Sequence, residues 1–273
     1  MRLATSPDGN GDVYGALKRT GMLDVMAKHN VQHVFQYSVD NLLVKMCDPL
    51  FIGFCISRNA SVGCKTVEKS APTEPVGVVC LRHGRPCVVE YSEISRAEAG
   101  AVSAATGRLL FSAAHLCINY FSRNFLVRAA GEDLQNTMFH HVAKKAIASL
   151  GGGGRTMAWK LEQYIFDMFP NADKLVVLQA RREEEFAPVK NADGTKPSDT
   201  PTTARHMLSR YHKLLIERAG GTLVSAADSC EEDEDRNLAE ISPLVSYEGE
   251  GLGESLIKYG GESKVLKLPL LLQ

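Results

Sequence analysis

A glycine-rich turn near the start of the chain has residue types suited to ligand binding. It reads Pro7-Asp8-Gly9-Asn10-Gly11. Glycine lets the backbone approach a flat or charged ligand closely, and the Asn10 amide offers both a hydrogen-bond donor and an acceptor. The same residue types also build ordinary surface turns. The turn is therefore a candidate binding loop whose role depends on the motifs that accompany it.

An acidic residue follows a strongly strand-like segment. Residues 31–39 are rich in β-branched and aromatic types, which predicts a buried strand, and Asp40 and Asn41 come next. Ligands of open α/β sheets collect at the carboxyl ends of strands. Asp40 thus stands where ligands of such a sheet collect, and a carboxylate is a hard oxygen ligand. The alternative is that Asp40 caps the following turn.

Strand and helix signals alternate along the rest of the chain and predict an α/β fold with a mixed sheet. Further strands are expected at 64–68, 77–81, 86–91 and 175–179, with a hairpin turn at 82–85. Helices are expected at 95–105, 160–169 and 202–219. Loops are expected at 151–154 and 192–200, an acidic solvated run at 230–236, a strand at 238–247 and a turn at 249–253.

The composition is that of an ordinary globular protein. The 273 residues are 44% hydrophobic and 23% charged, and the net charge of -1 provides no basic field for nucleic acid. The longest apolar stretches are too short to span a bilayer. The seven cysteines form no CxxC pair and no zinc-ligand spacing. We expect a cytoplasmic protein with buried, reduced thiols, no nucleic-acid partner and no membrane span.

A series of short motifs follows the first turn in a specific order. The motifs occupy residues 39–41, 66–69, 73–79, 88–94, 188–193, 201–205 and 240–247. In this order and spacing the chain resembles eukaryotic UDP-N-acetylhexosamine pyrophosphorylases over nearly its whole length. The resemblance implies a Rossmann-like nucleotide-diphospho-sugar transferase fold. It also implies UTP and N-acetylglucosamine-1-phosphate as substrates, and Mg²⁺ as cofactor.

The resemblance implies a nucleotide site. By the match, Gly9 approaches the uracil or ribose through its backbone, and Asp40 lies near the nucleotide phosphates as a ligand of magnesium. Lys160, in the segment that starts at Trp159, matches a lysine that reaches those phosphates. Cations there would offset charge on the non-bridging oxygens during phosphoryl transfer. A lysine at such a position is otherwise ordinary solvated surface.

The resemblance also implies a sugar-phosphate site. Asn10 is expected to hydrogen-bond the sugar, and Glu90 and Tyr91 match a sugar-contacting pair whose carboxylate accepts from two hydroxyls of one pyranose. Gly77 would leave room beside that pair. Lys190 matches a lysine that contacts the sugar phosphate. The alternative for Glu90 is a carboxylate at a helix N-terminus, stabilised by the helix dipole.

The chain departs from the family pattern in three respects. The family's phosphate-binding loop, of the form LxGGxGTRL, should precede Pro7 and is absent, and the glycines at 151–154 lack a leading strand and cannot replace it. His115 occupies the position of an asparagine that contacts the N-acetyl sugar, and neutral imidazole cannot offer an amide's paired donor and acceptor. Asp12 replaces a glycine. We therefore expect the fold to be incomplete at its N-terminus.

Two hypotheses remain open from the sequence. The first is a uridylyltransferase in which 1–225 is the C-terminal portion of the catalytic domain and 226–273 a partial C-terminal region. The second is a truncated or degenerate copy that binds a nucleotide sugar or a partner without catalysis. The motif series favours the first, whereas the absent loop and His115 favour the second. A sheet without its first βαβ unit would expose a strand edge, which predicts poor solubility.

Overall fold

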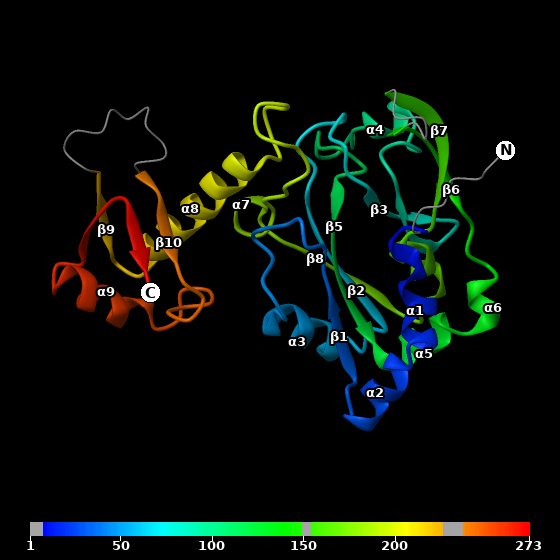
Figure 1. The fold of residues 1–273 in the computed structure, drawn as a ribbon, viewed down its shortest axis with the longest axis horizontal. Helices are drawn as coiled ribbons and strands as arrows, with labels where there is room; N and C mark the ends of the chain where they lie inside the picture. The colour runs from blue at the N-terminus through cyan, green and yellow to red at the C-terminus, as the bar shows by residue number, and fades with distance from the viewer. Residues whose placement is uncertain (1–7, 149–153, 226–236) are drawn as a thin grey trace. The chain divides into compact units, whose positions relative to one another are not determined.

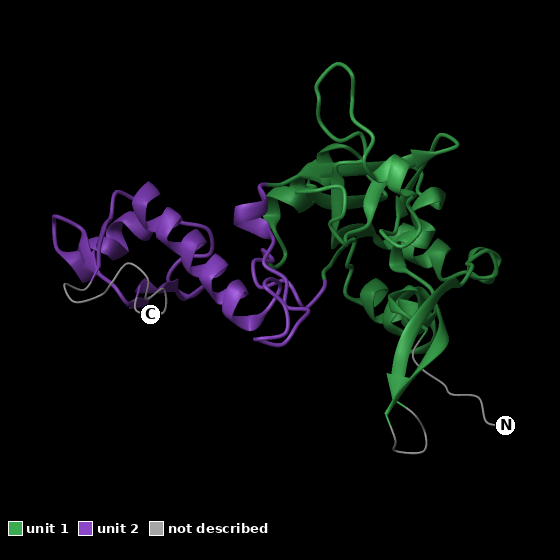
Figure 2. Ribbon diagram, turned by 90° about the horizontal axis from the view of Figure 1, so that it is seen from above, with its two compact units in different colours: residues 1–37, 46–180 green, residues 38–45, 181–273 purple. Residues whose placement is uncertain are grey.

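The chain folds into two compact units. The computed structural model describes residues 8–148, 154–225 and 237–273, and Figure 1 traces the fold. Unit 1 comprises Met1–Tyr37 and Met46–Ala180, and unit 2 comprises Ser38–Lys45 and Arg181–Gln273, as coloured in Figure 2. The division at residue 225 expected from the sequence is a different one and stays a prediction.

Unit 1 is built on a six-stranded mixed sheet, as predicted. The strands lie in the order β4-β3-β5-β2-β8, and β1 also pairs with β5. Strands β2 and β8 are parallel, whereas the other pairs are antiparallel. The strands are β1 His33–Gln36, β2 Val62–Glu68, β3 Val78–Arg82, β4 Arg85–Val89, β5 Ala113–Ser122 and β8 Leu175–Gln179.

The β3–β4 hairpin follows from its turn sequence. His83 and Gly84 have φ angles of 52° and 75°, as both central residues of a type I′ turn require. That turn matches the twist of the flanking strands, so the local sequence sets the strand pairing. The predicted hairpin turn is confirmed.

Strand β1 is shorter and more exposed than expected. It covers four of the nine residues predicted to form a buried strand, its pattern is exposed to half-buried, and Val39 beyond it is 89% exposed. Within the described residues β1 pairs with β5 alone. The prediction of a buried strand over 31–39 is wrong. β-branched residues indicate a preference for the strand conformation, but they do not determine whether other elements cover the strand.

Aromatic packing covers one face of this sheet. Phe121 of β5 stacks on Phe125 and contacts Phe169, and Tyr14 meets both Phe121 and Phe125 edge-on. These residues form one buried core. The helices of unit 1 are α1 Val13–Arg19, α2 Met22–Lys28, α3 Pro49–Ser57, α4 Arg96–Ala99, α5 Arg123–Ala129 and α6 Glu132–Gln135, with 3₁₀ turns η1 Asn10–Asp12 and η2 Ile165–Asn171.

Two helix predictions in unit 1 require correction. Residues 160–169 are not a helix, because Lys160 lies in β7 and η2 begins at Ile165. Strand β7 (Arg155–Glu162) pairs with β6 (His141–Ala148) as a separate hairpin. The helix expected at 95–105 is reduced to the single turn α4, which Ser95 and Glu98 start with a capping box.

Unit 2 is organised by one long helix. Helix α8 (Pro201–Arg218) is as predicted, with Thr200 as N-cap and proline as its first residue. One apolar core unites α8 with residues of β9 Thr222–Val224, β10 Ala239–Ile241, α9 Leu252–Gly260, β11 Val265–Lys267 and β12 Leu270–Leu272. Unit 2 also contains the short helix α7 Arg182–Glu185.

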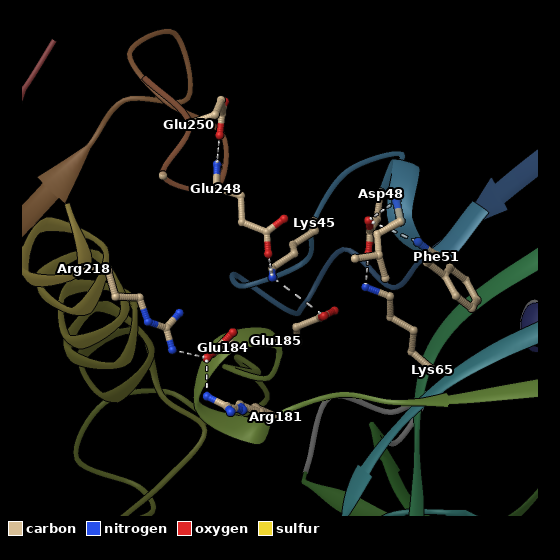
Figure 3. Close-up of polar contacts among 12 residues, drawn as sticks. Lys45, Asp48, Phe51, Lys65, Arg181, Glu184, Glu185, Arg218, Glu248 and Glu250 are labelled. Carbon is tan, nitrogen blue, oxygen red and sulfur yellow. Dashed lines mark hydrogen bonds and ion pairs between the residues drawn. The ribbon is translucent and has the colours of Figure 1, made fainter. Parts of the chain in front are cut away.

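Partly buried ion pairs hold the short segment 38–45 against the rest of unit 2. The Lys45 ammonium lies 3.9 Å from the Glu185 carboxylate and also bonds Glu248 (Figure 3). Burial opposes the charge on Lys45, but the bond to Glu248 and the charges of both carboxylates outweigh it and raise the lysine pKa. These contacts explain why the segment groups with residues that follow 180.

The remaining sequence expectations have mixed outcomes. The loop at 192–200 and the turn around Gly249 and Gly251 are confirmed, but the strand expected at 238–247 is limited to β10. Residues 151–153 and 230–236 lie outside the described residues. The expectation that the cysteines are buried is wrong for Cys47, which is exposed. Among the described residues, no helix has the length and apolar character needed to cross a membrane.

Candidate functional site

Three of the predicted sugar-site residues form a row across strands β4, β3 and β5. Val78 faces Val89 in β4, so Gly77 and Glu90 are the next residues beyond this pair. On the other side, the backbone N–H of His115 donates to the Gly77 carbonyl at 2.9 Å. The row lies near the carboxyl ends of the parallel strands β2 and β8, where α/β sheets bind ligands.

Gly77 is required by the position of the Glu90 carboxylate. A Cβ on Gly77 would lie 2.9 Å from Glu90 Oε1 and 2.9 Å from a methyl group of Val88. Any other residue would therefore push the Glu90 side chain aside. Glu90 begins a turn rather than a helix, because its carbonyl accepts from the N–H groups of Glu93 and Ile94. The alternative of a helix N-terminal carboxylate is wrong, since α4 begins only at Arg96.

A bulge in β5 brings His115 to a second polar residue of the same strand. Cys117 has a φ of 54°, and the register between β5 and β2 shifts beside it. Residues four apart in a regular strand are about 13 Å apart, yet here His115 Nε2 lies 3.0 Å from Asn119 Oδ1. Asn119 Nδ2 in turn donates to Gln36 Oε1 at 2.5 Å. The sequence analysis missed Asn119 and Gln36, whose only signal is a polar residue inside an apolar strand.

His115 is held neutral in this network. The rings of Phe166 and Phe169 pack edge-on against it. Burial lowers the pKa of His115 to about 4, although the hydrogen bond to Asn119 acts in the opposite direction. A neutral imidazole has one N–H, and here that N–H donates from Nε2 to Asn119 Oδ1. His115 can therefore offer a ligand only an acceptor at Nδ1.

The predicted binding turn is pinned to the segment that follows β7. Gly11 N donates to Gln163 O, and Gln163 N donates to Asp8 O, both at 2.9 Å. Gly9 has a φ of 76°, and a Cβ there would lie 2.3 Å from the carbonyl oxygen of Gln163. Asn10 accepts from Ile165 N at 2.9 Å through its side-chain oxygen. Close packing against Gln163 thus explains why Gly9 and Gly11 are glycines, whether or not a ligand binds this turn.

A buried histidine that the sequence analysis missed lies beside the sugar-site loop. His141 Nδ1 is 2.5 Å from Glu93 Oε1 and Nε2 is 2.9 Å from Asp167 Oδ1. Burial opposes the imidazolium, but the hydrogen bonds and charges of the two carboxylates outweigh it, so the pKa of His141 is raised. Through these two hydrogen bonds His141 connects the loop after Glu90 to η2. Burial and nearby carboxylates, Glu90 among them, raise the pKa of Tyr164 to about 12.

The raised pKa of His141 predicts a loss of stability at alkaline pH. A histidine whose folded pKa exceeds its unfolded pKa of about 6.5 stabilises the fold fully below that pH, and the contribution is lost as pH rises through the folded pKa. His141→Gln is expected to flatten this decline in the free energy of unfolding, measured by urea titration at pH 6 and pH 8. His140→Gln, at the adjacent exposed position, is the control. Equal declines in all three proteins would contradict the prediction.

Lys160 lies on β7 in a small charge cluster. Its ammonium is 2.6 Å from Glu162, which Lys145 also contacts at 2.8 Å. Burial acts against ionisation of Glu162, but the two lysines outweigh it and lower the carboxyl pKa. A phosphate could replace Glu162 as the partner of both lysines. Tyr91, the residue that follows Glu90, has an exposed side chain.

Unit 2 brings Asp40 close to Lys190. Val189 N donates to Asp40 O at 2.8 Å, and Lys190 follows directly. The Asn41 side chain accepts from Leu43 N and Ala187 N, so Asn41 performs the capping that was the alternative role for Asp40. Lys190 is exposed, with its ammonium 6.0 Å from the centroid of the Phe186 ring. Two residues 150 positions apart thus share one loop region.

The donor set fits a cation only in part. Among the described residues, no cluster of three or more histidine, cysteine or carboxylate side chains is placed to hold a metal ion. Asp40 supplies a single carboxylate. Magnesium commonly takes one or two carboxylates and completes its shell with phosphates and water, so Asp40 fits a nucleotide-bound ion rather than a protein-built site.

The sequence and the fold match known nucleotidyltransferases. The family described as UTP–glucose-1-phosphate uridylyltransferase matches residues 2–242. UDP-N-acetylhexosamine pyrophosphorylase-like protein 1 of Xenopus tropicalis is 42% identical over 286 residues, covering 100% of this chain and 55% of the relative. UDP-N-acetylglucosamine diphosphorylase 1 of Arabidopsis thaliana is 42% identical, covering 92% and 48%. The chain therefore spans about half the length of these relatives.

A solved structure gives the same result. The uridine diphosphate N-acetylglucosamine pyrophosphorylase of Trypanosoma brucei, crystallised with an inhibitor, superposes with a TM-score of 0.79 at 33% identity, covering 100% of this chain and 56% of that one. UDP-glucose pyrophosphorylase of Leishmania major, at 13% identity, shares the fold with a TM-score of 0.56. The chain therefore belongs to the UTP–glucose-1-phosphate uridylyltransferase family, within which it is similar to the UDP-N-acetylhexosamine pyrophosphorylases of eukaryotes.

Proposed function

We propose that this chain serves the transfer of a uridylyl group from UTP to N-acetylglucosamine-1-phosphate, which forms UDP-N-acetylglucosamine and pyrophosphate. Two relatives named for UDP-N-acetylglucosamine pyrophosphorylase or diphosphorylase are 40% and 42% identical to it. The observation that carries the proposal is the row of Gly77, Glu90 and His115 near the carboxyl ends of β2 and β8. In this proposal the chain acts in the cytoplasm, which cell fractionation tests.

Glu90 is the centre of the proposed sugar site. Its carboxylate can accept hydrogen bonds from two neighbouring hydroxyls of one pyranose, and Gly77 leaves the space that this side chain needs. Tyr91 and Asn10 supply further hydrogen-bonding groups. Any contact of the sugar with the His115 ring would use its acceptor, because its N–H is bonded to Asn119.

Cationic residues account for the phosphate side. In the proposed reaction a phosphate oxygen of the sugar phosphate attacks the α-phosphorus of UTP in line, and pyrophosphate leaves. Lys160 and Lys190 offset the charge that develops on non-bridging oxygens, while the backbone at Gly9 contacts the nucleoside. Mg²⁺, carried by the nucleotide phosphates and bound by Asp40, would neutralise further phosphate charge.

Substitution of Lys190 tests this assignment. Lys190→Ala is expected to weaken UDP-N-acetylglucosamine binding about 10- to 100-fold, because one charge-assisted phosphate contact contributes about 1.4–2.7 kcal/mol. Isothermal titration calorimetry measures the affinity, and chromatography of the nucleotide products measures turnover. Lys196→Ala, an exposed lysine of the same loop, is the matched control.

The outcomes separate the role of the residue from the function. Binding that survives Lys190→Ala unchanged removes Lys190 from the site. Binding without product formation would support a copy that only holds the nucleotide sugar. A chain that neither binds UDP-N-acetylglucosamine nor forms it would contradict the proposed function.

A further inference from the structure

Two cysteines face each other across the β3–β4 hairpin. Cys80 and Cys87 are direct partners in the strand register, and their Sγ atoms lie 3.6 Å apart. Both residues are half-buried rather than enclosed in the core. Small solutes can therefore reach these sulfurs, and no role in nucleotide or sugar binding involves them.

The backbone spacing suits a covalent bond between the two sulfurs. Leu81 faces Pro86 in the register, and because proline has no N–H, this is a non-hydrogen-bonded pair of the ladder. The two kinds of pair alternate, so Cys80 and Cys87 form a hydrogen-bonded pair with Cα atoms about 5.5 Å apart. Protein disulfides span about 4.4–6.8 Å between Cα atoms. To form the bond, the sulfurs must close from 3.6 Å to about 2.05 Å.

Burial keeps the Cys80 thiol protonated. Burial, followed by the hydrogen bond and charge of Cys87, raises the pKa of Cys80 to about 11. Either sulfur can be the donor in the 3.6 Å contact. Because the thiolate is the nucleophilic form of cysteine, burial slows attack by Cys80 at neutral pH.

We propose that Cys80 and Cys87 form a dithiol modification site that hydroperoxides convert into a cross-strand disulfide. One of the two sulfurs attacks a peroxide oxygen as the O–O bond breaks, which gives a sulfenic acid and one water. The other sulfur then attacks the sulfenic sulfur, and the departing hydroxide takes the proton of that second thiol as a second water. Two thiols and one hydrogen peroxide thus become one disulfide and two waters. This inference rests on the hairpin alone and is independent of the transferase activity.

Hydrogen peroxide and thiol labelling test the proposal on the intact chain. After oxidation, remaining thiols are blocked with N-ethylmaleimide and the protein is mapped by mass spectrometry. The expected result is a peptide that links Cys80 to Cys87, two fewer maleimide labels, and recovery of both labels after dithiothreitol. Because the bridge is detected in the unsubstituted chain, the test does not depend on whether a variant folds.

Three variants sharpen the result. Cys80→Ser and Cys87→Ser are each expected to lose the bridge, and the sulfenic acid that forms on the remaining cysteine is expected to be trapped by dimedone. Cys47→Ser removes an exposed thiol and is expected to form the bridge as before. Peroxide-treated chain in which Cys80 and Cys87 both still react with maleimide, or in which either pairs with another cysteine, would overturn the proposal.

Discussion

Replacing Asp48 by alanine is expected to lower the free energy of unfolding by about 3–5 kcal/mol, the cost of breaking a buried ion pair from one side. The Lys65 side chain is 0% exposed and the Asp48 side chain 4% exposed, with 2.5 Å between ammonium and carboxylate. Figure 3 shows this pair beside the start of α3. The substitution removes the negative charge that compensates a positive charge buried in β2.

The Asp48 carboxylate also caps α3, and a second variant separates this role from that of its charge. Asp48 Oδ1 accepts from Leu50 N at 2.9 Å and from Phe51 N at 3.3 Å, so it is the N-cap of α3. Asparagine caps helices as well as aspartate does. Asp48→Asn is therefore expected to keep the cap and lose the charge. It should lower the free energy of unfolding by about 1 kcal/mol less than Asp48→Ala does.

A double-mutant cycle measures the coupling between the two charges. Lys65→Met is expected to destabilise the chain, but Asp48→Asn combined with Lys65→Met is expected to cost less than the sum of the two changes, because neither charge remains buried. Urea denaturation measures all four proteins. Arg108→Ala, which removes an exposed ion pair with side chains 68% and 40% exposed, is the control and should cost less than about 1 kcal/mol. Additive penalties at Asp48 and Lys65 would refute the coupling.

His115 is expected to make the fold sensitive to acid. Its folded pKa of about 4 lies below the ordinary value of 6.5, so between these values the unfolded chain binds a proton that the folded chain does not. Stability from this group is therefore present above pH 6.5 and lost as the pH falls towards 4. The shift corresponds to about 3 kcal/mol at the low end of this range.

His115→Asn isolates this contribution from other titrating groups. The asparagine does not titrate, so the variant is expected to lose about 3 kcal/mol less free energy of unfolding than the parent between pH 6.5 and 4. Urea titrations at pH 4, 5, 6 and 7 provide the measurement. His33→Asn is the control for loss of an exposed imidazole, since the His33 ring bonds the Tyr120 hydroxyl at 2.8 Å. Parallel pH profiles for parent and His115→Asn would show that the folded protein protonates His115 readily.

Elements with local signals were predictable from the sequence. Helix α8 carries its start signal in Thr200 and Pro201, and the β3–β4 hairpin carries its turn in His83 and Gly84. Strand β8 matches its predicted bounds because a short run of branched residues stands between polar segments. In each case the residues that decide the conformation lie within a few positions of one another.

Elements whose conformation depends on distant partners were not predictable. Residues 160–169 have apolar residues at helical spacing, yet pairing with β6 holds Lys160 and Leu161 in a strand, and Pro170 lies inside the 3₁₀ turn that follows. Strand β5 was not predicted at all, because His115 and Asn119 interrupt its apolar pattern. Only its pairing with three other strands and the bulge at Cys117 bury those polar groups with partners.

The sequence by itself determined the family and the candidate ligand residues, because those follow from the order and spacing of short motifs. The resemblance also implied that Gly77 leaves room beside Glu90, and the structure shows the close contact that requires a glycine there. Only the tertiary structure decided which residues surround them: His141 between Glu93 and Asp167, and the buried pair of Asp48 and Lys65. A charged residue can be buried only where the fold brings a compensating group to it, and that compensation depends on contacts between segments distant in sequence.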